Sequence, residues 1–304
     1  MARYVVGRIF QAVLGLVFIA TLVFFVVRLT GDPGRILTSE FAPVEVQQEI
    51  RERLGLDEPL IVQYASYMSG LATGDLGRSF NGEPVIEILM ERLPATASLA
   101  FAALIVAVLL AIPLGVLSAV YQGSPVDIFS RTVALFGQSV PAFWLAIMLV
   151  LIFAVILRIL PVAYSQGPES YVLPSIAVGW AAVAGIARLV RSSMLDVLGS
   201  DYVLMARAKG LPSRVVVLKH GLRSAMVPVL TFSGLVLGSF LNGSVVVETV
   251  FAWPGIGELT LDAVTGRDFP VVQGAVLLIA LFFITINLGV DLLYAALDPR
   301  IRYR

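Results

Sequence analysis

The 304-residue sequence has no cysteine, one histidine, His220, and only two lysines, Lys209 and Lys219. Without cysteine there is no disulfide, no thiol nucleophile and no cysteine-ligated metal, and a single histidine excludes the H-E-x-x-H zinc motif. Ala208 and Leu218 precede the two lysines, so the phosphate-binding sequence G-x-x-x-x-G-K-[ST] does not occur. We therefore expect a chain that is not an enzyme and that binds no metal or cofactor itself.

Charged residues are scarce as well. They make up 14% of the chain against 58% hydrophobic residues, and the mean hydropathy is +0.92. A water-soluble globule cannot cover so much apolar surface, whereas the hydrocarbon of a bilayer accepts it. The 21 basic and 21 acidic residues balance, which gives no indication of nucleic-acid binding. The composition indicates an integral membrane protein.

Long uncharged intervals predict the transmembrane segments, because an unpaired charge in hydrocarbon is costly. Six intervals hold between 18 and 34 residues, and a spanning helix needs about 20. They lie between Arg8 and Arg28, Arg92 and Asp127, Arg131 and Arg158, Glu169 and Arg188, Arg223 and Glu248, and Asp268 and Asp291. We expect an all-α protein with six transmembrane helices. Residues 1–28 form a retained anchor, since the apolar run exceeds that of a signal peptide and no A-x-A cleavage sequence follows.

The basic residues predict the orientation, because short loops rich in arginine and lysine stay in the cytoplasm. With both termini inside, thirteen basic residues are cytoplasmic, and the short external loops hold only Arg158 and Arg267. Residues 29–92 then form an external insert, a long loop that crosses regardless of its charge. Its stretch from Pro43 to Leu54 has helical spacing, and we expect the insert to pack on the outer ends of the helices.

The cytoplasmic loop of residues 188–223 is long for a connection between two spans and contains seven basic residues. Asp201 can cap a helix from Tyr202 to Lys209, and Gly210 can end it in a left-handed turn. Because the side chain of Ala206 is small, the backbone of this helix is nearly bare at its surface. Such a helix is suited to dock in a groove on another protein, although an ordinary cytoplasmic loop explains the same residues.

The residues of this loop resemble the EAA loop of ABC importer permeases, in the form used by the dipeptide and oligopeptide branch. The similarity lies in Asp201-Tyr202 and in Ala206-Arg207-Ala208-Lys209-Gly210-Leu211, while the Glu-Ala-Ala of the broad consensus falls on Leu204-Met205-Ala206. Further similar motifs follow one another along the chain. They include Thr30-Gly31-Asp32-Pro33, Gly74-Asp75-Leu76-Gly77-Arg78-Ser79-Phe80, Pro254-Gly255-Ile256-Gly257, Arg267-Asp268-Phe269-Pro270, and Leu297-Asp298-Pro299-Arg300. The order resembles the first of the two paralogous permeases of this peptide and nickel family.

The resemblance implies the type I ABC importer permease fold, with the core at residues 93–297 and a cytoplasmic tail at 298–304. It implies half of a translocation pathway for di- or oligopeptides in the inner membrane of a bacterium. A second paralogous permease, one or two ABC ATPases that bind ATP and magnesium, and an external substrate-binding protein complete the importer. The residues implied to couple to the ATPase are Tyr202, Ala206, Arg207, Lys209, Gly210 and Leu211.

Polar residues inside the spans, and one acid at a span end, are candidates for lining the pathway. They are Gln138, Ser139, Ser239, Asn242, Thr285, Asn287 and Glu248. For the uncharged ones, a hydrogen bond between helices is the better explanation. Pro113, Pro141 and Pro174 inside the spans can kink their helices and make room for a pathway, or can simply be tolerated, as membrane helices often allow.

An ion-coupled secondary transporter or a channel is the main alternative. It would carry an intramembrane acid or base, and the six intervals contain none. A membrane enzyme is a second alternative, but it would need polar catalytic groups that converge at one depth. A membrane anchor is a third, but it would not explain the ordered loop motifs. Permeases of the resembled branch serve dipeptides, longer peptides, nickel chelates, glutathione and haem, and the substrate stays open among these.

Overall fold

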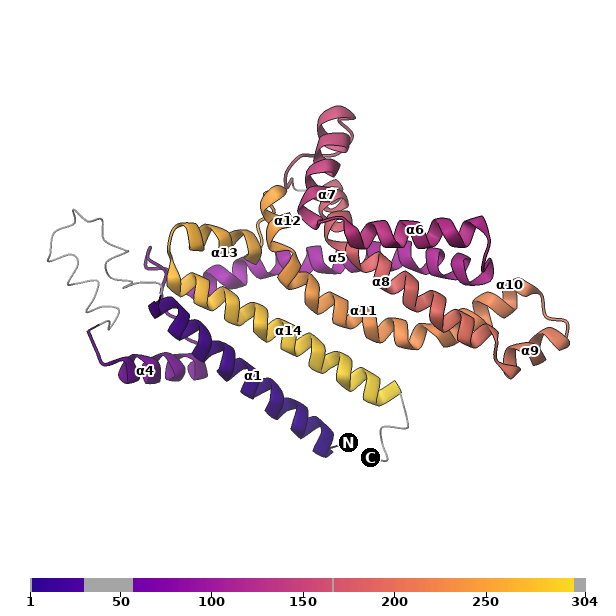
Figure 1. Ribbon diagram of the computed structural model, residues 1–304. Coiled ribbons are helices and arrows are strands. Elements are labelled where there is room, and N and C mark those ends of the chain that lie inside the picture. Colours follow the sequence, from indigo (N-terminus) through magenta and orange to yellow (C-terminus); the bar gives the residue numbers. More distant parts are fainter. Residues whose placement is uncertain (1, 30–56, 166, 298–304) are drawn as a thin grey trace. The chain divides into compact units, whose positions relative to one another are not determined.

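The computed structural model describes residues 2–29, 57–165 and 167–297, and this part of the chain is helical without a β-strand (Figure 1). The long helices are α1 (Ala2–Leu29), α5 (Val85–Val120), α8 (Val172–Leu198), α11 (Arg223–Gly243) and α14 (Phe269–Leu297). The shorter helices are α4 (Leu60–Thr73), α6 (Pro125–Ser139), α7 (Ala142–Leu149), α9 (Asp201–Ala208), α10 (Ser213–Val215), α12 (Val245–Val250) and α13 (Ile256–Thr265). Two π-helical segments, η1 (Val150–Ile156) and η3 (Val216–Leu222), and the 3-10 turn η2 (Pro168–Tyr171) complete the described elements. The stretch from Pro43 to Leu54 lies outside the described residues.

Five helical segments are long and apolar enough to cross a membrane, in agreement with the expected all-α membrane fold. They are Val5–Leu29, Val85–Val120, Pro168–Leu198, Ser213–Leu241 and Phe269–Leu292. The remaining expected span falls on a bent pair of helical segments, Pro125–Ser139 and Ala142–Ile156, which gives a sixth span if the pair counts as one. The two segments are bent by 104° relative to each other, and Figure 1 shows α7 turning away from α6.

The bend follows from Pro141, one of three prolines for which the sequence allows a kink; Pro113 and Pro174 lie within α5 and α8, which continue past them. Proline has no N–H to continue a helix and pushes the preceding residue out of the helical region. Val140 is accordingly extended, with φ −86° and ψ 122°. At the other end of α6, Ser124 accepts a hydrogen bond from the Asp127 backbone N–H, and Pro125 occupies the first turn. The helix therefore begins before Asp127 and Arg131, which the sequence analysis had used as limits of the spans.

The described chain divides into two compact units that are not continuous in sequence. One unit contains residues 97–253 and 286–297. Within it, α8 packs against α6, α7 and α11. α8 also approaches α5 closely, since a Cβ atom at Gly179 would lie 2.6 Å from the carbonyl oxygen of Ala103. Small residues at such contacts let membrane helices pack backbone to backbone.

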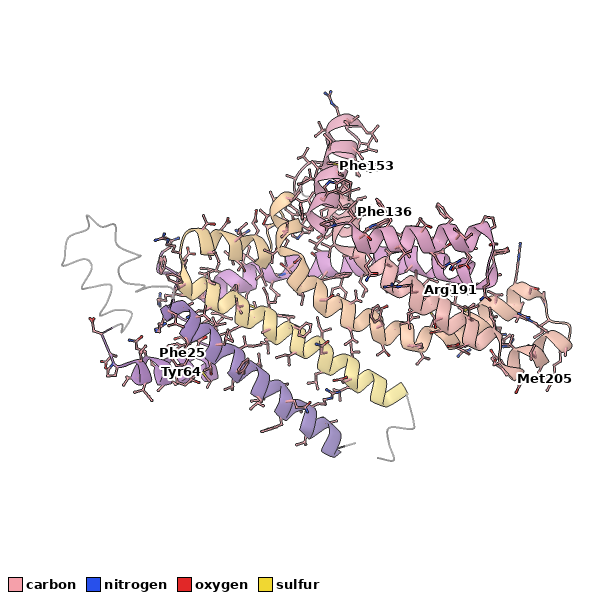
Figure 2. The ribbon with its side chains drawn as sticks, in the orientation of Figure 1. Phe25, Tyr64, Phe136, Phe153, Arg191 and Met205 are labelled. Carbon is pink, nitrogen blue, oxygen red and sulfur yellow. The ribbon has the colours of Figure 1, made fainter. Side chains whose placement is uncertain are left out.

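The other unit contains residues 2–96 and 254–285. Its core joins the start of α5 to α13 and α14. The buried core residues are Val85, Leu89, Ile256, Ala263, Val271, Ala275 and Leu278. The end of α1 packs on α4 through aromatic rings, with the centroids of Phe24 and Tyr64 5.3 Å apart and those of Phe25 and Tyr64 6.0 Å apart (Figure 2). The hydroxyls of Thr21 and Tyr64 also lie 2.8 Å apart, within hydrogen-bonding distance.

A polar contact within the same unit fixes the turn before α5 on the start of α14. The Ser79 hydroxyl donates to Asp268 Oδ2 over 2.5 Å, and the Phe80 backbone N–H donates to the same oxygen over 3.2 Å. The other oxygen of Asp268 accepts from the Val271 backbone N–H at the first turn of α14. Part of the 29–92 insert is thus held on the end of a long helix.

Candidate functional site

The loop between α8 and α11 contains the short helix that the sequence predicted. α9 runs from Asp201 to Ala208, and Gly210 follows with φ +73°, the left-handed conformation that ends the helix. The cap position is Ser200 rather than Asp201, because Ser200 is the last residue with extended backbone. Asp201 lies in the first turn, where a carboxylate still interacts favourably with the helix N-terminus.

The loop has a small hydrophobic core of its own. Val203 and Ala206 of α9 are buried against Val216 of η3, and Val197 and Leu198 at the end of α8 pack on them. Ala206 is therefore 7% exposed and faces inward, whereas the sequence analysis had proposed it as a surface contact. This core holds α9 firmly on the end of α8.

The opposite side of α9 is exposed and largely apolar. We define the α9 face as five exposed residues on α9 and just after it: Tyr202, Leu204, Met205, Lys209 and Leu211. Asp201, Arg207 and Ala208 of α9 are exposed as well. Met205, labelled in Figure 2, is 61% exposed, and apolar side chains that gather in an exposed patch mark interaction surfaces. Among these, the sequence proposed Tyr202, Lys209 and Leu211 for coupling and did not propose Leu204 or Met205, and the coupling role itself stays a prediction.

A cavity of about 440 Å³ opens between the α9 face and η3. The residues that line it are Asp201, Tyr202, Met205, Ala206, Lys209, Leu211 and His220. The rings of Tyr202 and His220 meet edge to face with centroids 5.7 Å apart. His220 is half-buried, and its ring packs against Tyr202 of the α9 face. An apolar face beside a cavity is suited to receive side chains of another protein.

A buried carboxylate connects the helix that carries this loop to its neighbours. Asp127 is 1% exposed and accepts hydrogen bonds from the Ser118 hydroxyl at 2.5 Å and the Gly123 backbone N–H at 3.0 Å. Arg191 of α8 donates Nε to Oδ1 at 3.2 Å and Nη2 to Oδ2 at 3.3 Å (Figure 2). Arg131 adds an ion pair at 3.1 Å. The cluster ties α5, α6 and α8 together, and sequence reasoning missed it because Asp127 and Arg131 served there only as span limits.

The uncharged pathway candidates lie on α6, α11 and α14. Gln138 and Ser139 are exposed at the end of α6, beside the bend. The hydroxyls of Ser139, Ser239 and Thr285 donate to carbonyls of their own helices, at Leu135, Val236 and Leu281. The Asn287 side-chain oxygen is buried and finds no hydrogen-bond donor among the described residues. The side chain of Asn242 lies outside the described residues.

Glu248 is fully buried in the short helix α12. Its Oε1 accepts from the Ser244 hydroxyl at 2.9 Å, and its backbone carbonyl accepts from the Trp253 N–H at 2.8 Å. Trp253 is itself buried against the rings of Tyr164 and Tyr171. Within this chain the Glu248 carboxylate contributes to the packing of the α12 corner, and a role in the pathway stays a prediction.

Comparison with known proteins places this arrangement among transport proteins. Residues 111–303 match the family described as "Binding-protein-dependent transport system inner membrane component", and residues 1–100 match the N-terminal family of such membrane components. The whole chain aligns with the whole length of the glutathione transport system permease protein GsiC, at 43% identity for Escherichia coli K12 and 45% for Salmonella typhimurium LT2.

Solved structures show the same fold at low sequence identity. A chain of the MetNI methionine ABC transporter, in inward-facing conformations, has a TM-score of 0.60 and 18% identity over 70% of this chain and 97% of its own. An amino acid ABC transporter has a TM-score of 0.50 and 17% identity over 70% of this chain and 94% of its own.

Proposed function

The chain belongs to the family of inner-membrane components of binding-protein-dependent transport systems, and on that basis we propose that it forms half of the translocation pathway of an ATP-driven importer for short peptides. As a multi-pass permease subunit it is non-catalytic. ATP and magnesium bind to partner ATPase subunits, and a second paralogous permease forms the other half of the pathway. An external substrate-binding protein delivers the peptide.

The α9 face carries the coupling part of this proposal. It presents exposed apolar side chains and Lys209 beside a cavity, and the core of Val203, Ala206 and Val216 fixes it on α8. A rigid helix that docks on an ATPase moves with the ATPase when its nucleotide-binding domains close. ATP can bias the pathway between its two states only if the ATPase binds one state more tightly than the other. Arg207 is exposed on α9 and lies at the edge of the proposed contact, and Gly210 forms the turn that ends α9.

The arrangement in the bacterial inner membrane follows from the distribution of basic residues. We propose that both termini and the 188–223 loop are cytoplasmic and that the 29–92 insert is external. Residues 1–28 serve as anchor, residues 93–297 as the permease core, and residues 298–304 as the cytoplasmic tail. Gln138 and Ser139 are the strongest pathway candidates, because they are polar, exposed and adjacent to the bend at Pro141.

Short peptides are the proposed substrates because the relatives aligned over the full chain are permeases for glutathione, a tripeptide. The test is uptake into proteoliposomes that contain the complete importer with its binding protein. We expect labelled glutathione or a labelled dipeptide to accumulate only when ATP is inside with the ATPase. Accumulation driven by an ion gradient without ATP would contradict the proposal and favour a secondary transporter.

A further inference from the structure

A second cavity, of about 380 Å³, lies at the end of α1 in the unit of residues 2–96 and 254–285. It is formed by the last turn of α1, by α4, by the turn at residues 75–80 and by the start of α14. No step of peptide import requires it. At this position α1, a predicted span, reaches the boundary between hydrocarbon and water.

Hydrogen-bond donors gather in this cavity. Among the lining residues, the Tyr67 hydroxyl and the Gln273 Nε2 atom are buried and have no hydrogen-bond partner among the described residues. Leaving such groups unpaired costs free energy, about 1–3 kcal/mol for each. Burial raises the pKa of Tyr67 to about 12, against the opposing effect of the Arg28 charge, so its hydroxyl is protonated at neutral pH.

Arg28 adds a positive charge to these donors. Its Nε donates to Gln63 Oε1 at 2.9 Å, and its guanidinium lies 4.1 Å from the ring centroid of Phe24. A guanidinium has five N–H donors, and this hydrogen bond uses one of them. A cation, a phenolic hydroxyl and an amide N–H₂ around one cavity suit an oxyanion, and phosphate in particular.

Three charged side chains on exposed residues line the same cavity: the carboxylates of Glu58 and Asp75 and the guanidinium of Arg78. Arg78 Nη1 donates to the Gly82 carbonyl, Asp75 Oδ1 accepts from the Gly77 backbone N–H, and the three side chains together carry a net negative charge. The buried donors and the exposed acceptors together fit a ligand that carries both charges, with the negative group inside and the positive group towards solvent. Apolar residues complete the lining, among them Val27, Val62 and Phe269.

The surface next to the cavity is apolar too. Phe25, Val26 and Leu29 at the end of α1 are exposed, in a segment long and apolar enough to span the membrane. Acyl chains can pack along this side of α1 while the headgroup enters the cavity.

We propose that the cavity binds the headgroup of a phospholipid that carries a phosphate and an ammonium group. The phosphate oxygens accept hydrogen bonds from Arg28, Tyr67 and Gln273, and the ammonium faces Glu58 and Asp75. The lipid then fills the space between α1, α4 and the start of α14 and stabilises the packing of this unit. This inference is independent of the peptide-import proposal, since it concerns a different unit of the chain.

The test uses the complete importer, purified in mild detergent and depleted of lipid. Phosphatidylethanolamine and phosphatidylglycerol with identical acyl chains, inorganic phosphate and a glycyl dipeptide are titrated separately, and bound ligand is measured by native mass spectrometry. Tyr67→Phe removes only the hydroxyl without a partner, so the lipid-free protein keeps its thermal stability. Its affinity for phosphatidylethanolamine is expected to fall about tenfold, the effect of one lost hydrogen bond to a charged group.

Tyr64→Phe is the matched control, because the Tyr64 hydroxyl contacts Thr21 and does not line the cavity. This variant is expected to lose thermal stability and to keep its lipid affinity. Glu58→Gln should reduce the preference for phosphatidylethanolamine over phosphatidylglycerol. The proposal is overturned if Tyr67→Phe binds phosphatidylethanolamine as tightly as the wild type, if the wild type shows no preference between the two lipids, or if phosphate or the dipeptide binds as well as the lipid.

Discussion

Replacing Met205 by glutamate is expected to abolish ATP-driven uptake while the two permeases still assemble. Met205 is 61% exposed at the centre of the α9 face, so the substitution does not disturb the hydrophobic core of the loop. If the α9 face docks on the ATPase as proposed, the same side chain is covered in the assembled importer. An unpaired carboxylate there costs about 3–5 kcal/mol, which weakens docking more than 100-fold. Transport in proteoliposomes and co-purification of the ATPase measure the two parts of this expectation.

Met90→Glu is the matched control, because Met90 is also an exposed methionine but lies at the start of α5, outside the α9 face. It should leave ATPase binding unchanged. Wild-type uptake by Met205→Glu would show that the α9 face is not the coupling surface.

Substitutions in the turn after α9 and in the loop core test the same coupling role in a second way. Gly210 has φ +73°, which proline cannot adopt because its ring fixes φ near −65°. Gly210→Pro should therefore displace the α9 face and uncouple ATP hydrolysis from uptake, whereas Gly210→Asn, which tolerates the left-handed region, should retain coupling. A leucine at the buried Ala206 overpacks the loop core and should uncouple as well. Unchanged transport in both Gly210→Pro and Ala206→Leu would contradict this role of the loop.

Replacing Asp127 by leucine is expected to have the largest effect on the stability of the permease. The substitution leaves Arg191 without its carboxylate, and breaking one half of a buried pair is far more costly than replacing both halves. Thermal unfolding of the purified importer should occur at a clearly lower temperature, and less assembled complex should be recovered. Asp127→Asn keeps the shape and hydrogen-bonding capacity towards Ser118 and should be less harmful.

The double variant Asp127→Leu with Arg191→Leu separates charge from packing. It should recover much of the lost stability, because no buried charge is left alone: the other partner of Asp127, Arg131, has a half-exposed side chain that water can solvate. The matched control is Glu258→Gln, which breaks the more exposed ion pair with Arg92, 3.7 Å long, and should change stability little. If the double variant is less stable than Asp127→Leu alone, an unpaired Arg191 charge is not the cause of the instability.

The parts of the fold that could be predicted are those that depend on residues close together in the sequence. The intervals between charges located the long helices, and the proline at residue 141 indicated the bend. Gly210 and the residues before it gave the end of α9, because a turn glycine acts on its own neighbours. Motifs in sequence order indicated the permease family, which the full-length relatives confirm.

The contacts that sequence reasoning missed depend on residues far apart in the chain. Asp127 and Arg191 are 64 positions apart, so nothing near Asp127 shows that it is buried and paired. α9 is apolar on more than one side, and only the position of Val216 determines that Ala206 is buried and Met205 exposed. The hydrogen-bond donors that line the cavity at the end of α1 likewise come from three separate helices.

The most direct test of the account is a pull-down of this chain from membranes in mild detergent, with mass spectrometry of the bound proteins. A parallel sample carries Met205→Glu. The account predicts that the wild-type chain retains a second permease and an ABC ATPase, and that the variant retains the permease but loses the ATPase. Recovery of the wild-type chain alone or as a homo-oligomer, with no ATPase, would contradict it.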